Sequence, residues 1–343
     1  MTGFAAGIVA WQKRQGRHDL PWQGTRDPYA IWVAEIMLQQ TQVGTVIPYY
    51  LRFLARFPDA AALAAAPLDE VLRLWSGLGY YSRARNLHRA AQEIAGAHGG
   101  RFPRRFEAVA ALPGVGRSTA AAICVFAFGQ RQAILDGNVK RVLARYRGIK
   151  GHGGDKKVAD ALWREAQRRL PRRHLEAYTQ GLMDLGAAVC TRSRPQCGVC
   201  PVHRGCIAYR RGWTGSVPAP RPRKRLPRKS TLMLALVRGG EVLLEKRPPT
   251  GIWGGMWCLP EAVRKTDVEA YCLKRFGVHV IEVDELPRIA HGFTHFKLDI
   301  RPLRLRVSAL VPEAAEPGVI WLPLEEARNA AIPAPVKRIL PQL

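Results

Sequence analysis

The chain has 343 residues, which is long for one domain and sufficient for two or three with separate hydrophobic cores. Lysine and arginine outnumber aspartate and glutamate by 53 to 27, so the net charge is +26 and nucleic acid is the favoured partner. A membrane-spanning protein is excluded, because no apolar run approaches the roughly 18 residues that a spanning helix needs. The apolar segment 4–11 lacks the end of a signal peptide, and we expect a cytoplasmic protein without a membrane partner.

The first chemically unusual residue is Glu35, in a helix predicted by the segment PYAIWVAEIMLQQT. Asp27 and Pro28 supply its N-cap and its first residue. The helical neighbours of Glu35 are apolar, so we expect its carboxyl to have a raised pKa and to hold a proton near neutral pH. A lone glutamate more often reaches solvent or pairs with an arginine, and the residues alone leave that alternative open.

A glycine-rich turn follows in the segment LWSGLGYYSRARN, which spans 74–86. Its glycines present Tyr80 and Tyr81 at a tip, and Arg83 and Arg85 come directly afterwards. An exposed aromatic ring beside basic residues suits stacking or wedging between nucleic-acid bases. A tyrosine that packs a helix junction fits the same pattern equally well.

A turn, a buried helix and a second carboxylate come next. The glycines of the turn at 112–116 permit close approach of backbone N–H groups to a phosphate. The apolar run 118–128 predicts a buried helix that ends at Gly129. Asp136 precedes a further helix over 138–147, whose positive end should favour the charged carboxylate. Two carboxyl groups in opposed environments suit acid-assisted cleavage of a glycosidic bond.

Four of the seven cysteines are crowded together with the spacing C-x6-C-x2-C-x5-C. In a reducing compartment such crowding fits metal ligation better than disulfides. Four thiolates so close in sequence can enclose either a Zn²⁺ ion or an iron–sulfur cluster, and the spacing alone permits both. The candidate ligands follow two helical patterns over 156–189 and are Cys190, Cys197, Cys200 and Cys206.

The character of the sequence changes after these cysteines. Residues 213–229 are rich in proline and basic residues and contain no acid, which predicts an extended linker. From 230 onwards the pattern indicates a β-hairpin that turns at Gly239-Gly240, a helix near 265–276 and short strands over 279–307. The expected fold is therefore multidomain α+β, with an all-α part followed by an α/β part.

Several motifs together resemble one known family. LPGVGRSTA followed by ILDGNVKRVLAR is similar to the helix-hairpin-helix signature of base-excision DNA glycosylases, and VAEIMLQQTQV resembles the catalytic-glutamate motif of their adenine-specific branch. The cysteine pattern resembles the [4Fe-4S] loop of this superfamily, and the last part resembles its Nudix-like domain. The resemblance implies a helical glycosylase domain over 1–212, with the hairpin near 108–130 and the cluster loop at 190–206, then the linker 213–229 and a Nudix-like 8-oxoguanine recognition domain over 230–343.

The resemblance also implies an activity and assigns residues to it. The expected enzyme is a monomer that binds duplex DNA, flips out adenine mispaired with 8-oxoguanine or guanine, and hydrolyses the N-glycosidic bond. Glu35 would protonate the leaving base and handle the incoming water. Asp136, supported by Asn138, would stabilise the oxocarbenium-like sugar either electrostatically or through a covalent step. The implied adenine pocket consists of Arg17, Trp22, Gln23, Leu38 and Gln180.

The remaining implied residues contact DNA. Tyr80 would wedge beside 8-oxoguanine, and Thr294 stands where serine is commoner in the loop that inspects this base. Ser118 replaces a lysine with which related pyrimidine glycosylases form a Schiff base, which predicts base removal without efficient strand cleavage. The full predicted DNA-binding set is Gln40, Thr41, Leu78, Gly79, Tyr80, Gly114, Gly116, Ser118, Lys140, Phe293, Thr294 and His295.

Two other interpretations remain open. One is a pyrimidine glycosylase with lyase activity, against which Ser118 and the C-terminal domain argue. The other is a protein whose hairpin and cysteine loop only hold DNA. Pyrophosphate hydrolysis is not expected, because no helix of metal-binding glutamates follows Pro260-Glu261 as it does in true Nudix hydrolases.

Overall fold

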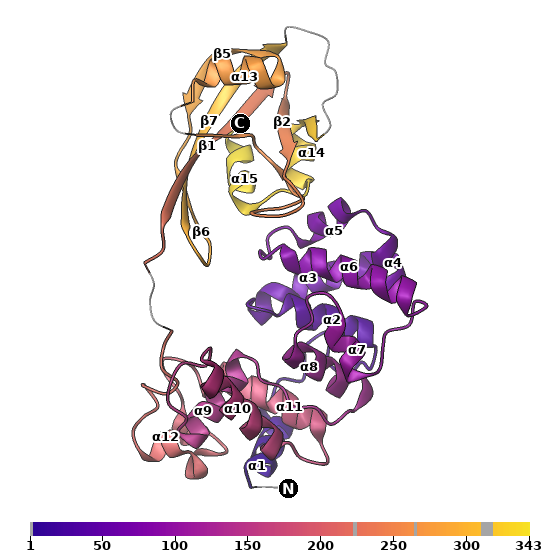
Figure 1. Ribbon diagram of the computed structural model, residues 1–343, viewed down its shortest axis with the longest axis vertical. Coiled ribbons are helices and arrows are strands. Elements are labelled where there is room, and N and C mark those ends of the chain that lie inside the picture. The colour runs from indigo at the N-terminus through magenta and orange to yellow at the C-terminus, as the bar shows by residue number, and fades with distance from the viewer. Residues whose placement is uncertain (1–2, 222–224, 264–265, 310–317) are drawn as a thin grey trace. The chain divides into compact units, whose positions relative to one another are not determined.

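The computed structural model describes residues 3–221, 225–263, 266–309 and 318–343, which form two compact units (Figure 1). The first unit contains Met1–Ala65 and Arg89–Arg223, and the second contains Ala66–His88 and Lys224–Leu343. This division differs from the predicted one, because residues 66–88 belong with the C-terminal residues. Part of the predicted linker, 222–224, and the start of the helix predicted near 265–276 lie outside the described residues.

The first unit is helical, as predicted. Asp27 caps the helix that carries Glu35, Gly129 ends the buried helix with φ 64°, and Asp136 caps the helix after it. The boundary between the units falls within α6. The helices are α1 (Gly3–Gln15), α2 (Pro28–Met37), α3 (Val43–Arg56), α4 (Ala60–Ala65), α6 (Ser82–Ala97), α7 (Phe106–Ala111), α8 (Arg117–Phe128), α9 (Gly137–Arg147), α10 (Lys156–Arg169), α11 (Leu175–Asp184) and α12 (Ile207–Arg210).

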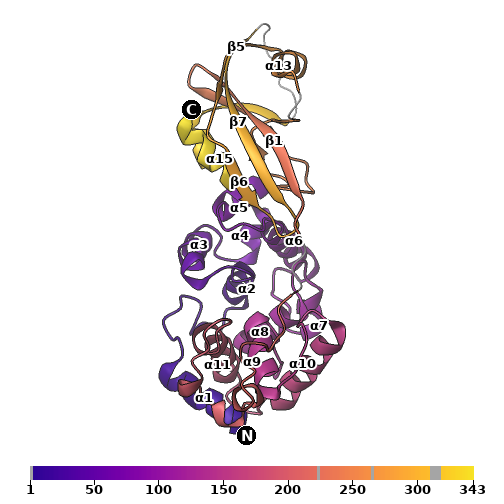
Figure 2. The same ribbon diagram turned by 90° about the vertical axis from the view of Figure 1, so that its left-hand side faces the viewer.

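One core of the first unit lies where α1, α9 and α11 meet. Ile8 of α1, Leu143 of α9 and Leu182 of α11 are each at most 2% exposed. Burial of one such side chain stabilises the fold by about 1.5–3 kcal/mol. α1 packs against α11, and the two helices lie side by side in both Figure 1 and Figure 2. α2 packs against α8. The packing of α2 on α8 brings the glutamate helix to the helix of the predicted hairpin.

A short π-helix, Leu185–Val189, continues α11 and passes very close to the start of α9. A Cβ atom on Gly186 would lie 2.5 Å from Cβ of Asn138, so only glycine permits this approach. The cysteine segment begins directly after this π-helix. The start of α9, which Asp136 caps, is therefore packed against the backbone that leads into the cysteines.

The second unit contains a mixed β-sheet, which confirms the α/β fold expected for the C-terminal part. β1 (Arg228–Arg238) and β7 (Lys297–Ala309) pair in parallel, and the predicted hairpin joins β1 to β2 across Gly239-Gly240. The sheet follows the order β3-β2-β1-β7-β5, while β4 pairs with β1, β6 with β7 and β8 with β2. The other strands are β2 (Glu241–Lys246), β3 (Trp257–Cys258), β4 (Glu261–Ala262), β5 (Val278–Glu285), β6 (Ile289–Gly292) and β8 (Val319–Pro323).

Helices cover this sheet and complete its core. Cys272 of α13 is fully buried with Leu234 and Leu305 of the central strands, and α13 contacts β5. None of the helices in the described ranges combines the length and the apolar character needed to cross a membrane. The helices of the second unit are α5 (Leu68–Trp75), the start of α6, α13 (Val268–Phe276), α14 (Leu324–Asn329) and α15 (Ala334–Ile339).

Candidate active site

Glu35 opens into a cavity of the first unit. The cavity measures 450 Å³, within the ~300–1,000 Å³ typical of pockets for small ligands. Ile31, one turn before Glu35 on α2, also lines it. Burial raises the pKa of the Glu35 carboxyl to about 8, and the negative charge of Asp136 contributes to the same shift. The predicted raised pKa of Glu35 is confirmed, and this carboxyl can hold a proton at neutral pH.

Asp136 lies close enough to act on Glu35 electrostatically. Its carboxylate accepts a hydrogen bond from the Val139 N–H at 2.7 Å as the N-cap of α9. Burial nevertheless raises the pKa of Asp136, although the N–H groups of Val139 and Asn138 and the cations of Arg141 and Lys140 lower it. The predicted lowered pKa is therefore wrong. The reason is that lost hydration of the carboxylate outweighs the favourable helix end.

The surroundings of the two acids still differ in kind. Donors and cations surround Asp136, whereas burial and a neighbouring negative charge act on Glu35. All the groups that oppose burial at Asp136 favour its charged form, and both effects at Glu35 favour its protonated form. Glu35 is therefore better suited to donate a proton, and Asp136 is better suited to face a developing positive charge.

Arg141, which the sequence did not single out, ties the start of α9 to the cysteine segment. It donates to Oδ1 of Asn138 at 2.8 Å, to the Gly186 carbonyl at 2.6 Å and to the Cys190 carbonyl at 2.7 Å. The predicted catalytic residue Asn138 thus lies in a hydrogen-bonded cluster beside Asp136. The sequence gives no signal of this role for Arg141, because two of its acceptors are backbone carbonyls distant in the chain.

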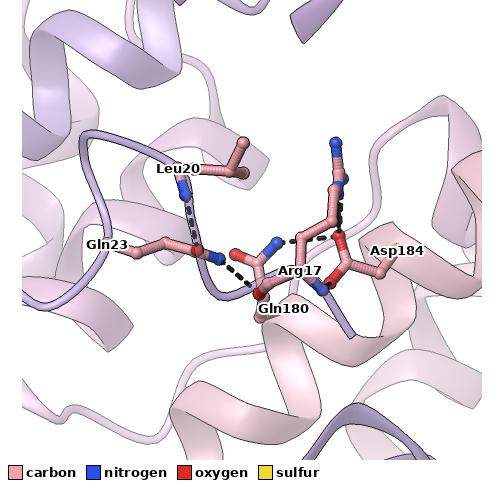
Figure 3. Close-up of polar contacts among 5 residues, drawn as sticks. All are labelled: Arg17, Leu20, Gln23, Gln180 and Asp184. Atoms are coloured by element: carbon pink, nitrogen blue, oxygen red, sulfur yellow. Dashed lines mark hydrogen bonds and ion pairs between the residues drawn. The ribbon is translucent and has the colours of Figure 1, made fainter. Parts of the chain in front are cut away.

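Three of the five predicted adenine-pocket residues line the Glu35 cavity, namely Trp22, Gln23 and Gln180. Arg17 and Leu38 are not among the residues that line it. The Arg17 guanidinium instead pairs with the Asp184 carboxylate at 2.5 Å, and the backbone N–H of Arg17 donates to the same carboxylate at 3.0 Å (Figure 3). The predicted pocket is therefore only partly assembled around Glu35.

Asp184, another residue missed in the sequence, organises this side of the cavity. It is 2% exposed and accepts hydrogen bonds from Arg17 and from Nε2 of Gln180, the latter at 2.9 Å. Gln23 bridges the same loop, donating to the Arg17 carbonyl and accepting from the Leu20 N–H (Figure 3). The available signal was an acid four residues after Gln180, one helical turn away.

The predicted hairpin has an exposed turn and a helix start without a side-chain cap. Gly114 adopts φ 78°, and Gly116 precedes α8 without a side-chain hydrogen bond to the helix start. A Cβ on Gly116 would meet open space. Ser118 accepts a hydrogen bond from the Leu135 N–H at 2.9 Å, and Lys140 donates to the Gly153 carbonyl at 3.3 Å. These two side chains therefore have internal partners as well as any external role.

In the second unit, the predicted tyrosine tip is exposed and internally supported. Tyr80 is 44% exposed at φ 49°, and the Arg83 guanidinium lies 5.5 Å from its ring centroid. Arg83 also donates to the carbonyls of Leu78 and Gly79. Leu78 is buried, its N–H donates to the Trp75 carbonyl at 3.0 Å and its own carbonyl accepts from Arg83. In the first unit, Gln40 is exposed at φ 58° and Thr41 is half-buried.

The segment predicted to inspect 8-oxoguanine forms the turn between β6 and β7. The Phe293 N–H donates to the Phe296 carbonyl at 2.9 Å, and the two rings stack with centroids 4.5 Å apart. Trp253 contacts Phe293 from another loop. Thr294 and His295 are exposed at the tip of this turn. The turn therefore presents a hydroxyl and an imidazole on a rigid aromatic base.

The four predicted ligands Cys190, Cys197, Cys200 and Cys206 line one cavity of the first unit. All are free thiols, and among the described residues no group of three or more histidine, cysteine, aspartate or glutamate side chains is arranged to hold a metal ion. Arg145 is 3% exposed and donates to Sγ of Cys190 at 3.4 Å and to the Thr191 carbonyl at 2.6 Å. Four thiolates around a shared space can serve as the ligands of either a zinc ion or an iron–sulfur cluster.

Comparison with known proteins agrees with this architecture. Residues 33–168 match the model of the HhH-GPD superfamily of base excision DNA repair proteins, and residues 232–342 match the NUDIX domain model. The chain resembles a thermostable thymine-DNA glycosylase with TM-score 0.56 and 32% identity over 61% of this chain and 95% of that one. A non-covalent endonuclease III–DNA complex, 22% identical with TM-score 0.53 over 61% of this chain and 94% of that one, shares the fold.

Fold and site together define a DNA glycosylase of the helix-hairpin-helix class with an added Nudix-like domain. An adenine DNA glycosylase of Buchnera aphidicola subsp. Baizongia pistaciae is 36% identical over 99% of this chain and 96% of its own length. The human adenine DNA glycosylase is 33% identical over 99% of this chain and 73% of its own length. The chain therefore belongs to the adenine DNA glycosylase family.

Proposed function

We propose that this protein excises adenine from duplex DNA in which adenine is mispaired with 8-oxoguanine or guanine. The observation that carries the proposal is the pairing of two unlike carboxyls, Glu35 with its raised pKa at the cavity and Asp136 within electrostatic reach of it. The family membership supports adenine as the target. We propose further that the protein acts as a monomer in the cytoplasm.

The flipped base would enter the Glu35 cavity. Flipping costs a few kcal/mol and is cheapest at a mismatch. Trp22 and Gln180 line the cavity, and Gln180 donates one amide proton to Asp184. Its amide oxygen would accept a hydrogen bond from the exocyclic amine of adenine. Both ends of the Gln23 amide are already bonded within the loop, so Gln23 shapes the cavity rather than reading the base.

Bond cleavage would then use the two acids in different roles. Protonated Glu35 donates its proton to the purine, which makes the base a better leaving group. The sugar acquires oxocarbenium character as the glycosidic bond breaks, and the Asp136 carboxylate stabilises that positive charge. Deprotonated Glu35 next accepts a proton from the attacking water. Arg141 and the Val139 N–H hold the start of α9 and the Asp136 carboxylate for this step.

The direct test is incubation with a duplex that contains one 8-oxoguanine:adenine pair, followed by alkali to cleave abasic sites. The wild-type protein should generate the cleaved strand, and Glu35→Gln and Asp136→Asn should lose excision by at least about 100-fold, in line with the contribution of a positioned acid or base. Asp160→Asn, an exposed charge removal on α10, is the matched control. A guanine:cytosine duplex should remain intact.

Binding separates a catalytic role from a structural one. Asp136→Asn should keep its affinity for the mispaired duplex while losing cleavage. Loss of both would instead assign Asp136 a structural role. Unchanged product yield with Glu35→Gln would favour a protein that only binds DNA. Trapping with borohydride should give no covalent complex, because Ser118 lacks the amine that forms a Schiff base.

The exposed turn at Thr294 is the proposed reader of 8-oxoguanine, and Tyr80 is the proposed wedge beside it. Thr294→Ala should lower the preference for adenine opposite 8-oxoguanine over adenine opposite guanine by roughly fivefold, the worth of one hydrogen bond. Thr294→Ser keeps the hydroxyl and should keep the preference. Equal behaviour of the two variants would exclude a hydrogen bond from this side chain.

The four cysteines are the proposed ligands of a [4Fe-4S] cluster. When bound, the cluster would hold the segment between Cys190 and Cys206 in one conformation. Arg145 supports the same segment through carbonyls and one thiol. Purified protein should contain about four iron and four sulfide per chain, and Cys197→Ser should reduce this content. One equivalent of zinc without sulfide would contradict the proposal.

A further inference from the structure

The loop that carries Tyr80 is anchored at both ends to C-terminal residues of the same unit. Ser76, at 4% exposure, donates its hydroxyl proton to the Ile332 carbonyl at 2.7 Å. Arg85 donates from Nη1 to the Gly254 carbonyl at 2.8 Å. One anchor precedes the tip in the chain and the other follows it.

The helix before the loop is attached to the same C-terminal residues. The Asp69 carboxylate of α5 accepts hydrogen bonds from Nζ of Lys246 on β2 and from the indole N–H of Trp257 on β3, the latter at 3.2 Å. Gly255 lies against Leu72 of α5, where an added Cβ would be 3.5 Å from Cδ1. The segment 66–88 thus packs on the sheet domain through both polar and apolar contacts.

Contacts inside the loop have a different consequence. The Trp75 indole N–H donates to the Gly79 carbonyl at 3.2 Å, and Arg83 donates to the same carbonyl at 3.1 Å. These local bonds determine the shape of the tip. They do not attach the tip to the sheet domain, because Trp75, Gly79 and Arg83 all belong to the segment 66–88. That function requires bonds that reach the C-terminal residues, such as those of Ser76 and Arg85. Nζ of Lys337 also donates to the Ser76 carbonyl, at 3.4 Å.

We infer that Ser76 and Arg85 are positioning residues through which the C-terminal sheet domain holds Tyr80, so that discrimination of the opposite base depends on this attachment. The inference rests on the proposed wedge role of Tyr80. The sheet domain then contributes to recognition in two ways, through its own exposed turn at Thr294 and through the placement of a tyrosine that lies far earlier in the chain. Both recognition elements belong to one unit.

The test compares Ser76→Ala and Arg85→Met with wild type in the full-length protein. Hydrogen exchange of the amides at 77–81, measured without DNA, should accelerate roughly fivefold in each variant, the effect of one lost hydrogen bond. The ratio of single-turnover excision rates opposite 8-oxoguanine and opposite guanine should fall roughly fivefold as well. Ser76→Ala changes no charge, so a lost phosphate contact cannot explain its effect.

Arg304→Met is the matched control for Arg85→Met, because Arg304 pairs with Asp284 within the sheet at 2.8 Å. It removes the same charge and should change neither readout. Unchanged exchange at 77–81 in Ser76→Ala and Arg85→Met would overturn the inference, as would an equal effect of Arg304→Met. If Ser76→Ala does not fold, the half-buried Arg85 carries the test.

Tyr80→Ala separates this inference from the function on which it rests. If Tyr80→Ala lowers the discrimination ratio and the anchor variants do not, the positioning role is wrong and the wedge role stands. If Tyr80→Ala leaves the ratio unchanged, the wedge role is wrong, and with it the recognition part of the inference. The exchange measurement then reports the anchoring by itself.

Discussion

At the scale of single residues, the site depends on how burial changes two carboxyl groups. Glu35 and Asp136 belong to different helices, yet the charge of one raises the pKa of the other. Burial acts on both, and only Asp136 has cations and N–H donors to oppose it. The difference in surroundings, rather than in residue type, separates the proposed proton donor from the proposed stabiliser of positive charge.

The excision rate should therefore depend on the protonation of Glu35. With a pKa of about 8, the reactive protonated form is present at neutral pH and is lost as the pH rises through that value. Single-turnover rates should be level near pH 7 and fall about tenfold per pH unit well above 8. Asp160→Asn should give the same profile. A rate that keeps increasing above pH 8 would contradict the role of Glu35 as acid.

The same shift predicts a pH dependence of stability. The folded pKa of Glu35 exceeds its unfolded value of 4.5, so the folded state binds more protons between pH 4.5 and 8 and loses stability as the pH rises through this range. Glu35→Gln lacks this loss and should gain about 1–2 kcal/mol over wild type between pH 5 and pH 8, less than the full shift because the cavity admits water. Urea unfolding of both proteins at pH 5 and at pH 8 measures the difference in unfolding free energy. An equal difference between variant and wild type at the two pH values would refute the prediction.

At the scale of elements, the site depends on the close contact between α9 and the π-helix after α11. Gly186→Ala would place a Cβ 2.5 Å from Cβ of Asn138 and 3.1 Å from its Cα, so one element must move. We expect a loss of about 1–3 kcal/mol in unfolding free energy and a reduced excision rate, because α9 positions Asp136. Thermal unfolding and single-turnover kinetics measure the two effects.

Gly44→Ala is the control for this substitution. Gly44 lies in α3, where an added Cβ meets nothing within 4 Å, and alanine should be neutral or stabilising there. If Gly186→Ala were as well tolerated as Gly44→Ala, the contact between α9 and the π-helix would not constrain the site.

At the scale of the whole molecule, the net charge of +26 governs encounter with DNA. Binding to any duplex should release counterions, so affinity should fall at least about tenfold between 50 and 200 mM salt, for matched and mispaired duplexes alike. Fluorescence anisotropy at several salt concentrations measures the slope. The excision rate of the bound complex should change little, because both acids are buried and salt screens buried groups weakly. An affinity independent of salt would show that the net positive charge does not contribute to DNA binding.

The sequence by itself determined the local features of this protein. Caps at Asp27 and Asp136, the glycine stop at Gly129 and the hairpin at Gly239-Gly240 follow from backbone chemistry within a few residues, and the structure contains all four. The raised pKa of Glu35 was also predictable, because its apolar neighbours lie on the same helix.

Only the tertiary structure decided the features that depend on distant segments. The pKa direction of Asp136, the diversion of Arg17 to Asp184 and the attachment of 66–88 to the C-terminal sheet domain each involve partners brought together by packing. A one-dimensional pattern reports the neighbours of a residue along a helix or strand. Desolvation, cavity lining and ion pairing depend on everything that surrounds the residue in space, and folding alone supplies those neighbours.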